Sequence, residues 1–229
     1  MKTLAMITAR GGSKRIPRKN IKEFNGKPII AYSIEAALGS GVFDEVMVST
    51  DDEEIAEIAK NYGAKVPFLR SEKTSNDFAT TTDVIEEVLE TYKERGEEFD
   101  IFCCIYPTAP FITSKRLKDA VEELSNSDAD SLIPVVRFSY PPQRAMEVHD
   151  GRLVFRQPEN LKKRSQDLEP HFHDAGQCYV VRSESFFKNH GIMVGDILPM
   201  ELSELEVQDI DNEVDWKLAE LKYNLLNNG

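Results

Sequence analysis

A basic loop with two adjacent glycines lies near the start of the chain, where residues 9–20 read A-R-G-G-S-K-R-I-P-R-K-N. Seven lysines and arginines and a single glutamate lie between positions 10 and 27, whereas the whole chain carries a formal charge of −12. Gly11 and Gly12 allow the backbone to approach an anion and to turn N–H groups toward it. The loop therefore predicts a site for a small, highly charged anion such as a nucleoside triphosphate. The alternative is a solvated basic loop whose glycines only make a turn.

Two carboxylates, Asp209 and Asp211, are separated by one residue in the segment Q-D-I-D. In an extended segment alternate side chains point to the same side, so both carboxylates could bind one Mg²⁺, which prefers oxygen ligands. Alternatively, Asp211 or Asn212 caps a helix that begins near Glu213, because acidic and amide side chains stabilise helix N-termini. The two roles are compatible.

A dense polar cluster lies between positions 164 and 177. It consists of Arg164, Gln166, His171, His173, Asp174 and Gln177. So many polar groups in a short segment are not typical of a core, and they suit a substrate rich in hydroxyls, amides and carboxylates. The H-x-H-D pattern also resembles part of a zinc site, although the sequence offers no third ligand at a suitable spacing.

Strands and helices alternate around these groups. Leu4–Thr8 is predicted to be a buried strand that ends at the basic loop, and Ile29–Leu38 has the apolar spacing of a helix. Further strands are predicted at 46–49, 66–69, 101–105, 132–136 and 177–181, and further helices at 53–62, 82–95, 115–124 and 213–226. Asp51 or Asp52 is expected to cap the second helix. The alternation predicts an α/β fold with a mostly parallel sheet flanked by helices, whose ligands bind beyond the carboxyl ends of the strands.

The alternation breaks after Arg137. The pair Asp150-Gly151, flanked by alternating residues, predicts a two-residue hairpin turn. We expect one domain over residues 1–229, with residues 138–165 as a small inserted hairpin that serves a partner surface, most simply in a homodimer. The alternative is an extra layer on the same domain.

Composition excludes several classes of protein. The pI near 4.9 argues against a duplex nucleic-acid binder, which needs an extended basic surface. The three cysteines form an odd set, and the adjacent Cys103 and Cys104 are expected to be core residues because they lie inside an apolar run. The alternative is a redox or metal role, although no spaced C-x-x-C accompanies them. The apolar run before Arg10 is too short for a secretory signal, and no stretch is long enough to span a bilayer. These features predict a cytoplasmic protein without a nucleic-acid or membrane partner.

Several motifs occur together in one order between residue 4 and about residue 216. They are the basic loop, N-G-K-P-I-I-A-Y-S-I, V-S-T-D-D, L-R-S-E, Y-P-T-A-P and V-Q-D-I-D. The combination resembles the CMP-sugar synthetase (acylneuraminate cytidylyltransferase) family. The resemblance is strongest to the members that use pseudaminic acid, through R-S-Q-D-L-E-P, H-D-A-G-Q and S-E-L-E-V-Q-D-I-D. It implies a Rossmann-like homodimer that joins CTP to this acidic nine-carbon sugar with Mg²⁺, releasing pyrophosphate and CMP-pseudaminic acid.

The resemblance also assigns roles to individual residues. The expected nucleotide contacts are Ala9, Arg10, Gly11, Gly12, Ser13, Lys14, Lys19, Asn20, Arg70, Thr80 and Thr81. Among them Arg10, Lys14 and Lys19 are expected to be catalytic, together with Asp209 and Asp211 as the metal ligands. The expected sugar contacts are Tyr106, Arg164, Gln166, His173 and Gln177.

Two of these positions differ from the usual sialic acid enzymes. Tyr106 stands where those enzymes carry glutamine, and His173 lies near the position of their second arginine. Outside the family, Arg70 could be a surface cation, and the hydroxyls of Thr80 and Thr81 could simply cap a helix.

Other functions remain open at the level of sequence. One is a cytidylyltransferase for N-acetylneuraminic, legionaminic or 3-deoxy-manno-octulosonic acid, and another is a general sugar-1-phosphate nucleotidyltransferase. From a different class comes a non-catalytic nucleotide-binding protein, against which the acid pair at 209 and 211 argues.

Overall fold

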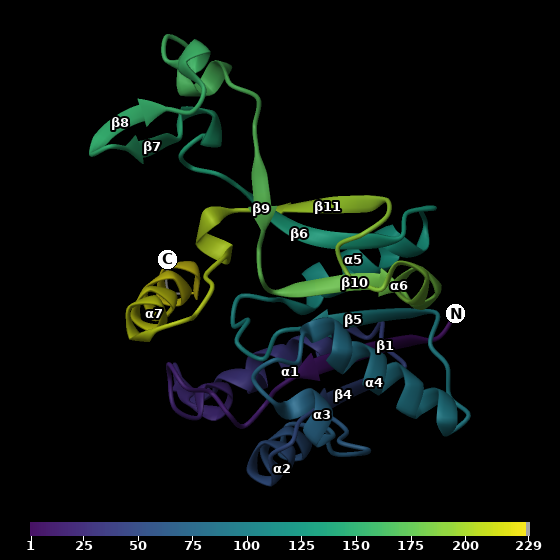
Figure 1. Ribbon diagram of the computed structural model, residues 1–229. Coiled ribbons are helices and arrows are strands. Elements are labelled where there is room, and N and C mark those ends of the chain that lie inside the picture. The colour runs from purple at the N-terminus through teal and green to yellow at the C-terminus, as the bar shows by residue number, and fades with distance from the viewer. Residues whose placement is uncertain (228–229) are drawn as a thin grey trace.

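Short buried strands form one central sheet, as the computed structural model shows for residues 1–227 (Figure 1). Its strands are β1 (Thr3–Thr8), β4 (Glu45–Ser49), β5 (Ile101–Ile105), β6 (Ser131–Arg137), β9 (Phe172–Asp174), β10 (Cys178–Arg182) and β11 (Ile197–Leu202). They lie in the order β11-β6-β10-β5-β1-β4, with β9 paired to β6. Strands β1, β4, β5, β6 and β11 run in one direction, whereas β9 and β10 are antiparallel to their neighbours. The sheet is therefore mixed but mostly parallel, as predicted.

Helices cover both faces of this sheet. They are α1 (Ile29–Ser40), α2 (Glu53–Asn61), α3 (Glu72–Ser75), α4 (Thr81–Glu94), α5 (Ser114–Ser125), α6 (Ser183–Asn189) and α7 (Glu213–Asn227). Short 3-10 helices lie at η1 (Lys19–Ile21), η2 (Pro142–Arg144), η3 (Pro158–Asn160), η4 (Ser165–Asp167) and η5 (Glu204–Glu206). Residues 1–227 include no helix long and apolar enough to cross a bilayer.

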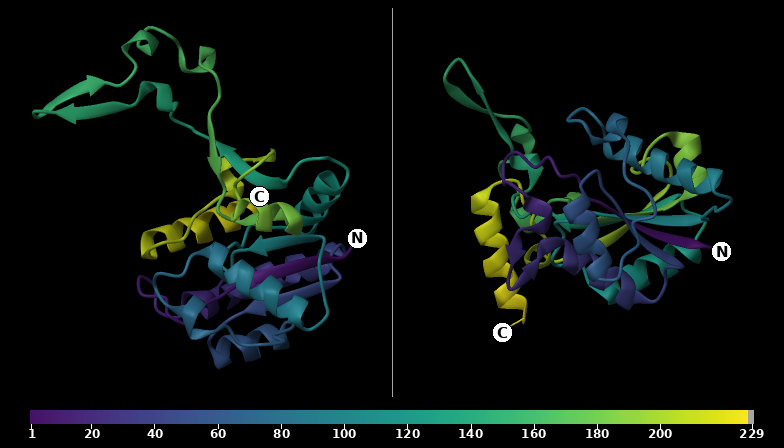
Figure 2. Two further views of the ribbon diagram at one scale, coloured as in Figure 1. Left: turned by 45° about the vertical axis from the view of Figure 1, so that its right-hand side comes forward. Right: turned by 90° about the horizontal axis from the view of Figure 1, so that it is seen from below.

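Alternation along β1 divides the core into two layers. Ala5 and Ile7 belong to the apolar cluster that includes α1, α2 and α5, whereas Leu4 and Met6 belong to the cluster that includes α4 and α6. The right-hand view of Figure 2 shows the helices on the two sides of the sheet. Because both faces are covered, the central strands β1, β5 and β10 are buried on both sides, which explains why they are nearly continuous apolar runs in the sequence.

A third apolar cluster attaches α7 to the domain. Phe24 of β2 (Glu23–Phe24), which pairs with β3 (Lys27–Pro28), is fully buried there. Its ring packs edge-on against Tyr32, Trp216 and Tyr223, with centroids 5.5–5.6 Å apart. The chain just after the basic loop therefore contacts the C-terminal helix directly.

The predicted hairpin is confirmed as β7 (Met146–His149) and β8 (Arg152–Phe155), which pair antiparallel around Asp150 and Gly151. Both turn residues have positive φ, 49° and 73°, as a type I′ turn requires. The hairpin projects away from the body of the molecule (Figures 1 and 2).

The predicted strand at Val66–Leu69 is wrong. Only Lys65 forms a bridge to β4, at Met47, and the next backbone bond to this edge runs from Arg70 N to Thr50 O at 2.8 Å. Between them lies Pro67, which has no N–H to give to a ladder. The segment therefore follows the edge of the sheet without joining it.

Candidate active site

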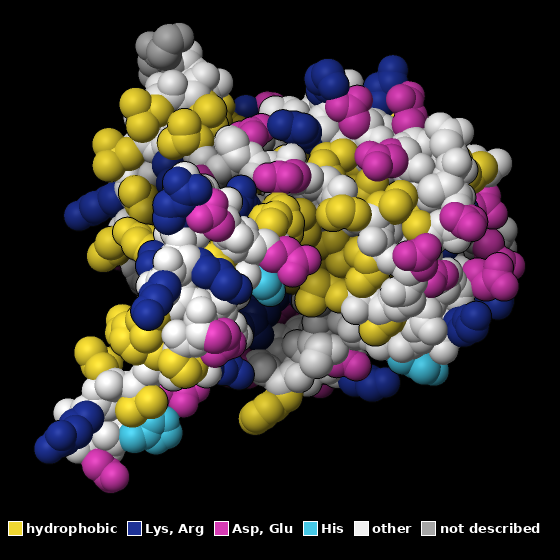
Figure 3. Space-filling model, turned by 90° about the horizontal axis from the view of Figure 1, so that it is seen from above, with side chains coloured by type: hydrophobic (Ala, Val, Ile, Leu, Met, Phe, Trp, Pro, Cys, Tyr) yellow, Lys and Arg dark blue, Asp and Glu magenta, His cyan; other side chains and the backbone are white. Residues whose placement is uncertain are grey.

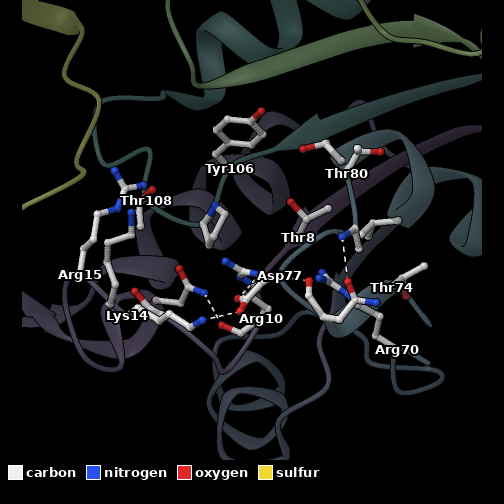
Figure 4. A pocket seen from close by; sticks show the side chains of 18 of the residues that line it. Thr8, Arg10, Lys14, Arg15, Arg70, Thr74, Asp77, Thr80, Tyr106 and Thr108 are labelled. Atoms are coloured by element: carbon white, nitrogen blue, oxygen red, sulfur yellow. Dashed lines mark hydrogen bonds and ion pairs between the residues drawn. The ribbon is translucent and has the colours of Figure 1, made fainter. Parts of the chain in front are cut away.

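A cavity of about 640 Å³ lies at the carboxyl ends of β1 and β5. Its walls come from five segments: the loop after β1, residues 70–79, the start of α4, residues 106–108 after β5, and the segment that carries Asp209 and Asp211. Figure 4 shows Arg10, Lys14 and Arg15 on one side of this cavity and Arg70, Thr74 and Thr80 on another. The fold thus brings the basic loop and the distant acid pair into one site.

The basic loop is fixed by hydrogen bonds to the corner after β4. Ala9 N donates to Ser49 O at 2.9 Å, and Gly11 N donates to Asp51 Oδ1 at 2.9 Å. A Cβ at Gly11 would lie 2.7 Å from Asp52 Oδ2, so only glycine fits this close approach. Gly11 N–H is therefore used within the protein, and Ala9 is fully buried.

Arg18 and Asp52 form the second anchor of this loop. The Arg18 guanidinium donates to both Asp52 oxygens, and Asp52 also caps α2 by accepting a 3.0 Å bond from Ile55 N. Of the two predicted caps, Asp52 is thus the one that occupies the position. Arg18 has a left-handed backbone with φ of 55°, a conformation that a side chain with Cβ adopts only when its surroundings hold it. Its charge faces α2, and it is not among the residues that line the cavity.

Three cations of the cavity are paired with carboxylates. Arg10 and Lys14 both contact Asp77, and Arg15 Nη2 lies 2.7 Å from Asp211 Oδ1. Figure 4 shows Asp77 between the Arg10 and Lys14 side chains. The hydrogen bond from Lys14 and its charge lower the pKa of Asp77. The sequence carried no signal for Asp77, a single acidic residue in the polar segment S-N-D-F.

Asp209 and Asp211 both line the cavity. Lys19 Nζ donates to the carbonyl of Ile210 between them at 2.5 Å, which joins the basic loop to the acid pair. Asn212 Oδ1 accepts from the N–H groups of Val214 and Asp215, so the amide, rather than Asp211, serves as the cap of α7. Partial desolvation raises the pKa of Asp209, and the nearby Asp211 charge raises it further.

This arrangement fits Mg²⁺. Two mutually repelling carboxylates beside a phosphate site suit a cation that binds through one or two carboxylates, substrate phosphates and water. Among residues 1–227 no group of three or more histidines, cysteines or acids could hold a metal by itself. A Mg²⁺ ion held by this pair would need further oxygen ligands, which substrate phosphates and water can supply.

Arg70 lines the other end of the cavity and is only 8% exposed. Its guanidinium donates to Ser49 O at 2.7 Å and to Ser49 Oγ at 3.1 Å, and burial lowers its pKa. It is thus not a surface cation.

Thr80 and Thr81 lie at the start of α4, and both line the cavity. Thr80 is the N-cap of α4, forming a reciprocal capping box with Asp83, so its hydroxyl is already engaged. Ser13, Asn20 and Tyr106 also line the cavity, whereas Gly12 faces open space. Asn20 holds the loop by donating to Arg10 O at 2.8 Å.

A second cavity of about 440 Å³ adjoins the first, because Asp209 lines both. His173 and Asp174 from β9 lie in its wall, with Arg137 from the end of β6 and Lys222 from α7. Asp174 accepts a 2.6 Å hydrogen bond from Tyr179, whose ring is 5.6 Å from that of Tyr106 in the first cavity. Arg137 and Lys222 were not singled out from the sequence, since only the fold brings these positions together.

Three of the predicted sugar contacts lie outside both cavities. Arg164 is exposed and pairs with Asp167, at 2.8 and 3.0 Å. Gln166 lines a third cavity, of about 370 Å³, and the buried Gln177 donates to Glu206 O. Within one chain, therefore, only Tyr106 and His173 of the predicted sugar contacts reach the two joined cavities.

Comparison with known proteins agrees with this geometry. The chain is 43% identical over 232 residues to a pseudaminic acid cytidylyltransferase of Campylobacter jejuni subsp. jejuni serotype O:2, covering 98% of this chain and 97% of that protein. It is 34% identical over 228 residues to a CMP-N,N'-diacetyllegionaminic acid synthase of Legionella pneumophila subsp. pneumophila, covering 96% of this chain and 95% of that protein.

The fold is also found in solved structures. A CMP:2-keto-3-deoxy-manno-octonic acid synthetase complexed with CTP superposes with a TM-score of 0.69 at 21% identity, covering all of both chains. A 4-diphosphocytidyl-2C-methyl-D-erythritol synthase from Anaerococcus prevotii gives 0.67 at 12% identity, covering 97% of this chain and 98% of the other. The family described as Cytidylyltransferase matches residues 4–213. The chain therefore belongs to this family of nucleotidyltransferase enzymes.

Proposed function

We propose that this enzyme joins CTP to pseudaminic acid, giving CMP-pseudaminic acid and pyrophosphate. The observation that carries the nucleotide half is the single cavity lined by Arg10, Lys14 and Lys19 together with Asp209 and Asp211. The choice of sugar is supported by the 43% identity to a relative with that named activity.

The reaction follows from the charges around the cavity. The anomeric oxygen of the sugar acid attacks the α-phosphorus of CTP in line, the new P–O bond forms, and the bond to the departing pyrophosphate breaks. Arg10, Lys14 and Lys19 stabilise the negative charge that grows on the pyrophosphate. Asp209 or Asp211 accepts the proton of the anomeric hydroxyl. When bound at these carboxylates, Mg²⁺ would neutralise negative charge on the phosphate oxygens.

The nucleotide and the sugar occupy the two joined cavities in this proposal. CTP lies in the larger one, with its triphosphate at the basic loop and its base toward Arg70, Thr80 and Thr81. The sugar lies in the second one, next to Asp209. Asp209 is thus beside the point where the two substrates meet.

A panel of sugar acids tests this function. The protein is incubated with CTP, Mg²⁺ and pseudaminic, N-acetylneuraminic, N,N'-diacetyllegionaminic or 3-deoxy-manno-octulosonic acid, and both pyrophosphate and the CMP-sugar are measured. We expect the highest kcat/KM with pseudaminic acid. A higher value with another acid reassigns the sugar, and turnover of UTP or GTP with a sugar phosphate contradicts the cytidylyltransferase assignment. CTP binding without pyrophosphate release under any condition would indicate a non-catalytic protein.

We also propose a homodimer that uses residues 138–165 as its contact arm on an otherwise single domain of residues 1–229, whose last two residues lie outside the described structure. The hairpin exposes four apolar side chains: Met146 at 51%, Val148 at 69%, Leu153 at 66% and Val154 at 47%. Figure 3 shows hydrophobic side chains along the projecting arm. A two-stranded hairpin is marginal alone in water, and an exposed apolar patch of this kind is typical of a contact surface.

We place the reaction in the cytoplasm. Cys103, Cys104 and Cys178 are all buried free thiols, which suits a reducing compartment.

A further inference from the structure

The carboxylates that line the second cavity would repel an acidic substrate, and the cations in the same wall can offset this repulsion. Three carboxylates, Asp174, Glu204 and Asp209, are among the residues that line it. A sugar acid would bring one more negative charge close to these carboxylates, and like charges near one another repel. Any acidic substrate here needs a cation that is free to meet it.

Arg137 is that cation. It is the last residue of β6 and lies at the carboxyl end of that strand, the same edge of the sheet from which the loop after β1 begins. It lines both the second and the third cavity. Among residues 1–227 it takes part in no ion pair, unlike Arg10, Lys14 and Arg15 in the first cavity. Its planar fork can bind a carboxylate through two parallel hydrogen bonds.

Lys222 adds a second positive charge to the same wall. Its Nζ donates to Glu204 O at 3.0 Å and to Val207 O at 2.8 Å, which brings the ammonium from α7 to the edge of the cavity near Asp209. An ammonium has three protons, so one remains for a ligand. The two backbone bonds hold the charge in place before any substrate arrives, which reduces the entropy lost on binding.

We propose that Arg137, assisted by Lys222, binds the carboxylate of the sugar acid and thereby makes the enzyme specific for acidic sugars. The proposal rests on the proposed function and adds the residues that recognise the sugar. With the carboxylate at Arg137, the neighbouring anomeric carbon of a 2-keto sugar acid is brought toward Asp209, where the second cavity meets the first.

The competing contact is Arg164, which the family resemblance assigns to the sugar. Within one chain its guanidinium is held by Asp167 on the exposed arm, and it lines neither the first nor the second cavity. From the exposed arm it is also a candidate contact for the site of a second subunit. Carboxylate binding by Arg137 and carboxylate binding by Arg164 therefore lead to different predictions for their variants.

The test measures steady-state kinetics of the full chain with pseudaminic acid and with its methyl ester, which removes the charge and keeps the ring. The variants are Arg137→Met, Arg137→Lys, Lys222→Met and Arg164→Met, with Lys118→Met on the exposed side of α5 as the control for loss of a surface cation. Calorimetry measures the direct binding of CTP to each variant, which reports separately on folding and on the nucleotide site.

We expect Arg137→Met to raise the KM for the sugar acid about 100-fold, the scale of losing a bidentate charge-assisted contact, and to leave CTP binding within about twofold of the parent. Arg137→Lys should recover part of this loss. Lys222→Met should raise the same KM about tenfold. The parent should prefer the acid over the ester by about 100-fold, whereas Arg137→Met should use both alike.

Other outcomes overturn the inference. If Arg137→Met keeps the parent's KM and its preference for the acid, Arg137 does not bind the carboxylate, and the same losses in Arg164→Met would assign that role to the arm of a partner. An unchanged KM in Lys222→Met would limit Lys222 to its backbone contacts. Failure of the proposed function looks different, because the parent itself would then release no pyrophosphate with any sugar acid.

Discussion

At the scale of single residues, Asp209 occupies the most informative position in the molecule. It is the acidic residue of the Q-D-I-D segment that lines both cavities. The nearby Asp211 forms an ion pair with Arg15, and the Ile210 carbonyl between the two aspartates accepts a hydrogen bond from Lys19. A substitution at Asp209 should therefore affect chemistry without removing a structural contact of its side chain.

Asp209→Asn should lower kcat by about 100-fold or more, the scale of losing one preorganised electrostatic contact in an active site. Pyrophosphate release at saturating CTP and sugar measures the loss, and titration with Mn²⁺ measures whether metal affinity falls with it. Asp119→Asn on the exposed face of α5 is the matched control. Near-normal Mg²⁺-dependent turnover in Asp209→Asn would remove this residue from the site.

The sequence could predict this residue because its chemistry is local. Two acids at alternate positions and a run of cations with glycines are recognisable without a fold. Asp77, Arg137 and Lys222 could not be predicted in this way, because their roles depend on which segments the sheet brings together. Gln177 was predicted to contact the sugar because it lies in a polar motif, but its side chain instead donates a hydrogen bond to the Glu206 carbonyl.

At the scale of elements, the corner between β4 and α2 holds the basic loop in shape. Asp52 is the centre of this corner, because it accepts from Arg18 and from the first turn of α2 and lies against Gly11. The hydrogen bond from Arg18 is the main cause that lowers the pKa of Asp52. The ionised form of Asp52 therefore stabilises the folded state.

Asp52→Asn keeps a capping oxygen but removes the charge, and it should lower the free energy of unfolding by about 1 kcal/mol at pH 7, as expected for a partly exposed ion pair. Because the folded pKa lies below the ordinary value of 3.8, this contribution is present above pH 3.8 and is lost as the pH falls through the folded pKa. Urea unfolding of parent and variant should therefore converge in acid. Asp128→Asn on an exposed loop is the control, and a gap that persists unchanged into acid would contradict the ion-pair explanation.

The attachment of α7 is a second element whose loss can be measured. Phe24→Ala should cost about 3–5 kcal/mol, the usual range for removing a buried ring. Trp216, the only tryptophan of the chain, packs on this ring, so its fluorescence should shift to the red as α7 loosens. Phe24→Leu should cost less, since it leaves a smaller cavity. Unchanged emission together with unchanged urea stability would show that Phe24 does not hold the helix.

Helices and strands were predicted correctly where the apolar periodicity was strong, and wrongly where backbone hydrogen bonding determined whether a segment joins the sheet. The strand before the basic loop and the helices on the sheet followed from apolar spacing. Val66–Leu69 has the apolar composition of a strand, but Pro67 removes a donor and the segment stays outside the sheet. The reversed direction of β10 could not be predicted either, because strand direction is set by the path of the connecting chain.

At the scale of the whole molecule, the arm at residues 138–165 is the contact surface of the homodimer that we propose. Val148→Glu combined with Leu153→Glu should convert a dimer into a monomer, because charged side chains would be buried in the contact. Light scattering coupled to size-exclusion chromatography gives the mass. Arg152→Glu at the turn is the control, since it adds the same charge without replacing an apolar side chain. A double variant that keeps the parent's mass would show that the arm is only an extra layer of its own domain.

The position of β10 has a consequence for the order in which this protein can be made. Strand β5 pairs with β1 on one edge, but its other edge is closed by β10, which begins only at Cys178. The newly synthesised chain therefore carries an open, apolar strand edge until the residues of β10 have left the ribosome, and such edges are prone to aggregate. Contacts of this sequence separation also slow folding. Because Asp209 follows β11 in the sequence, the acid pair that lines the first cavity is made only after every strand of the sheet.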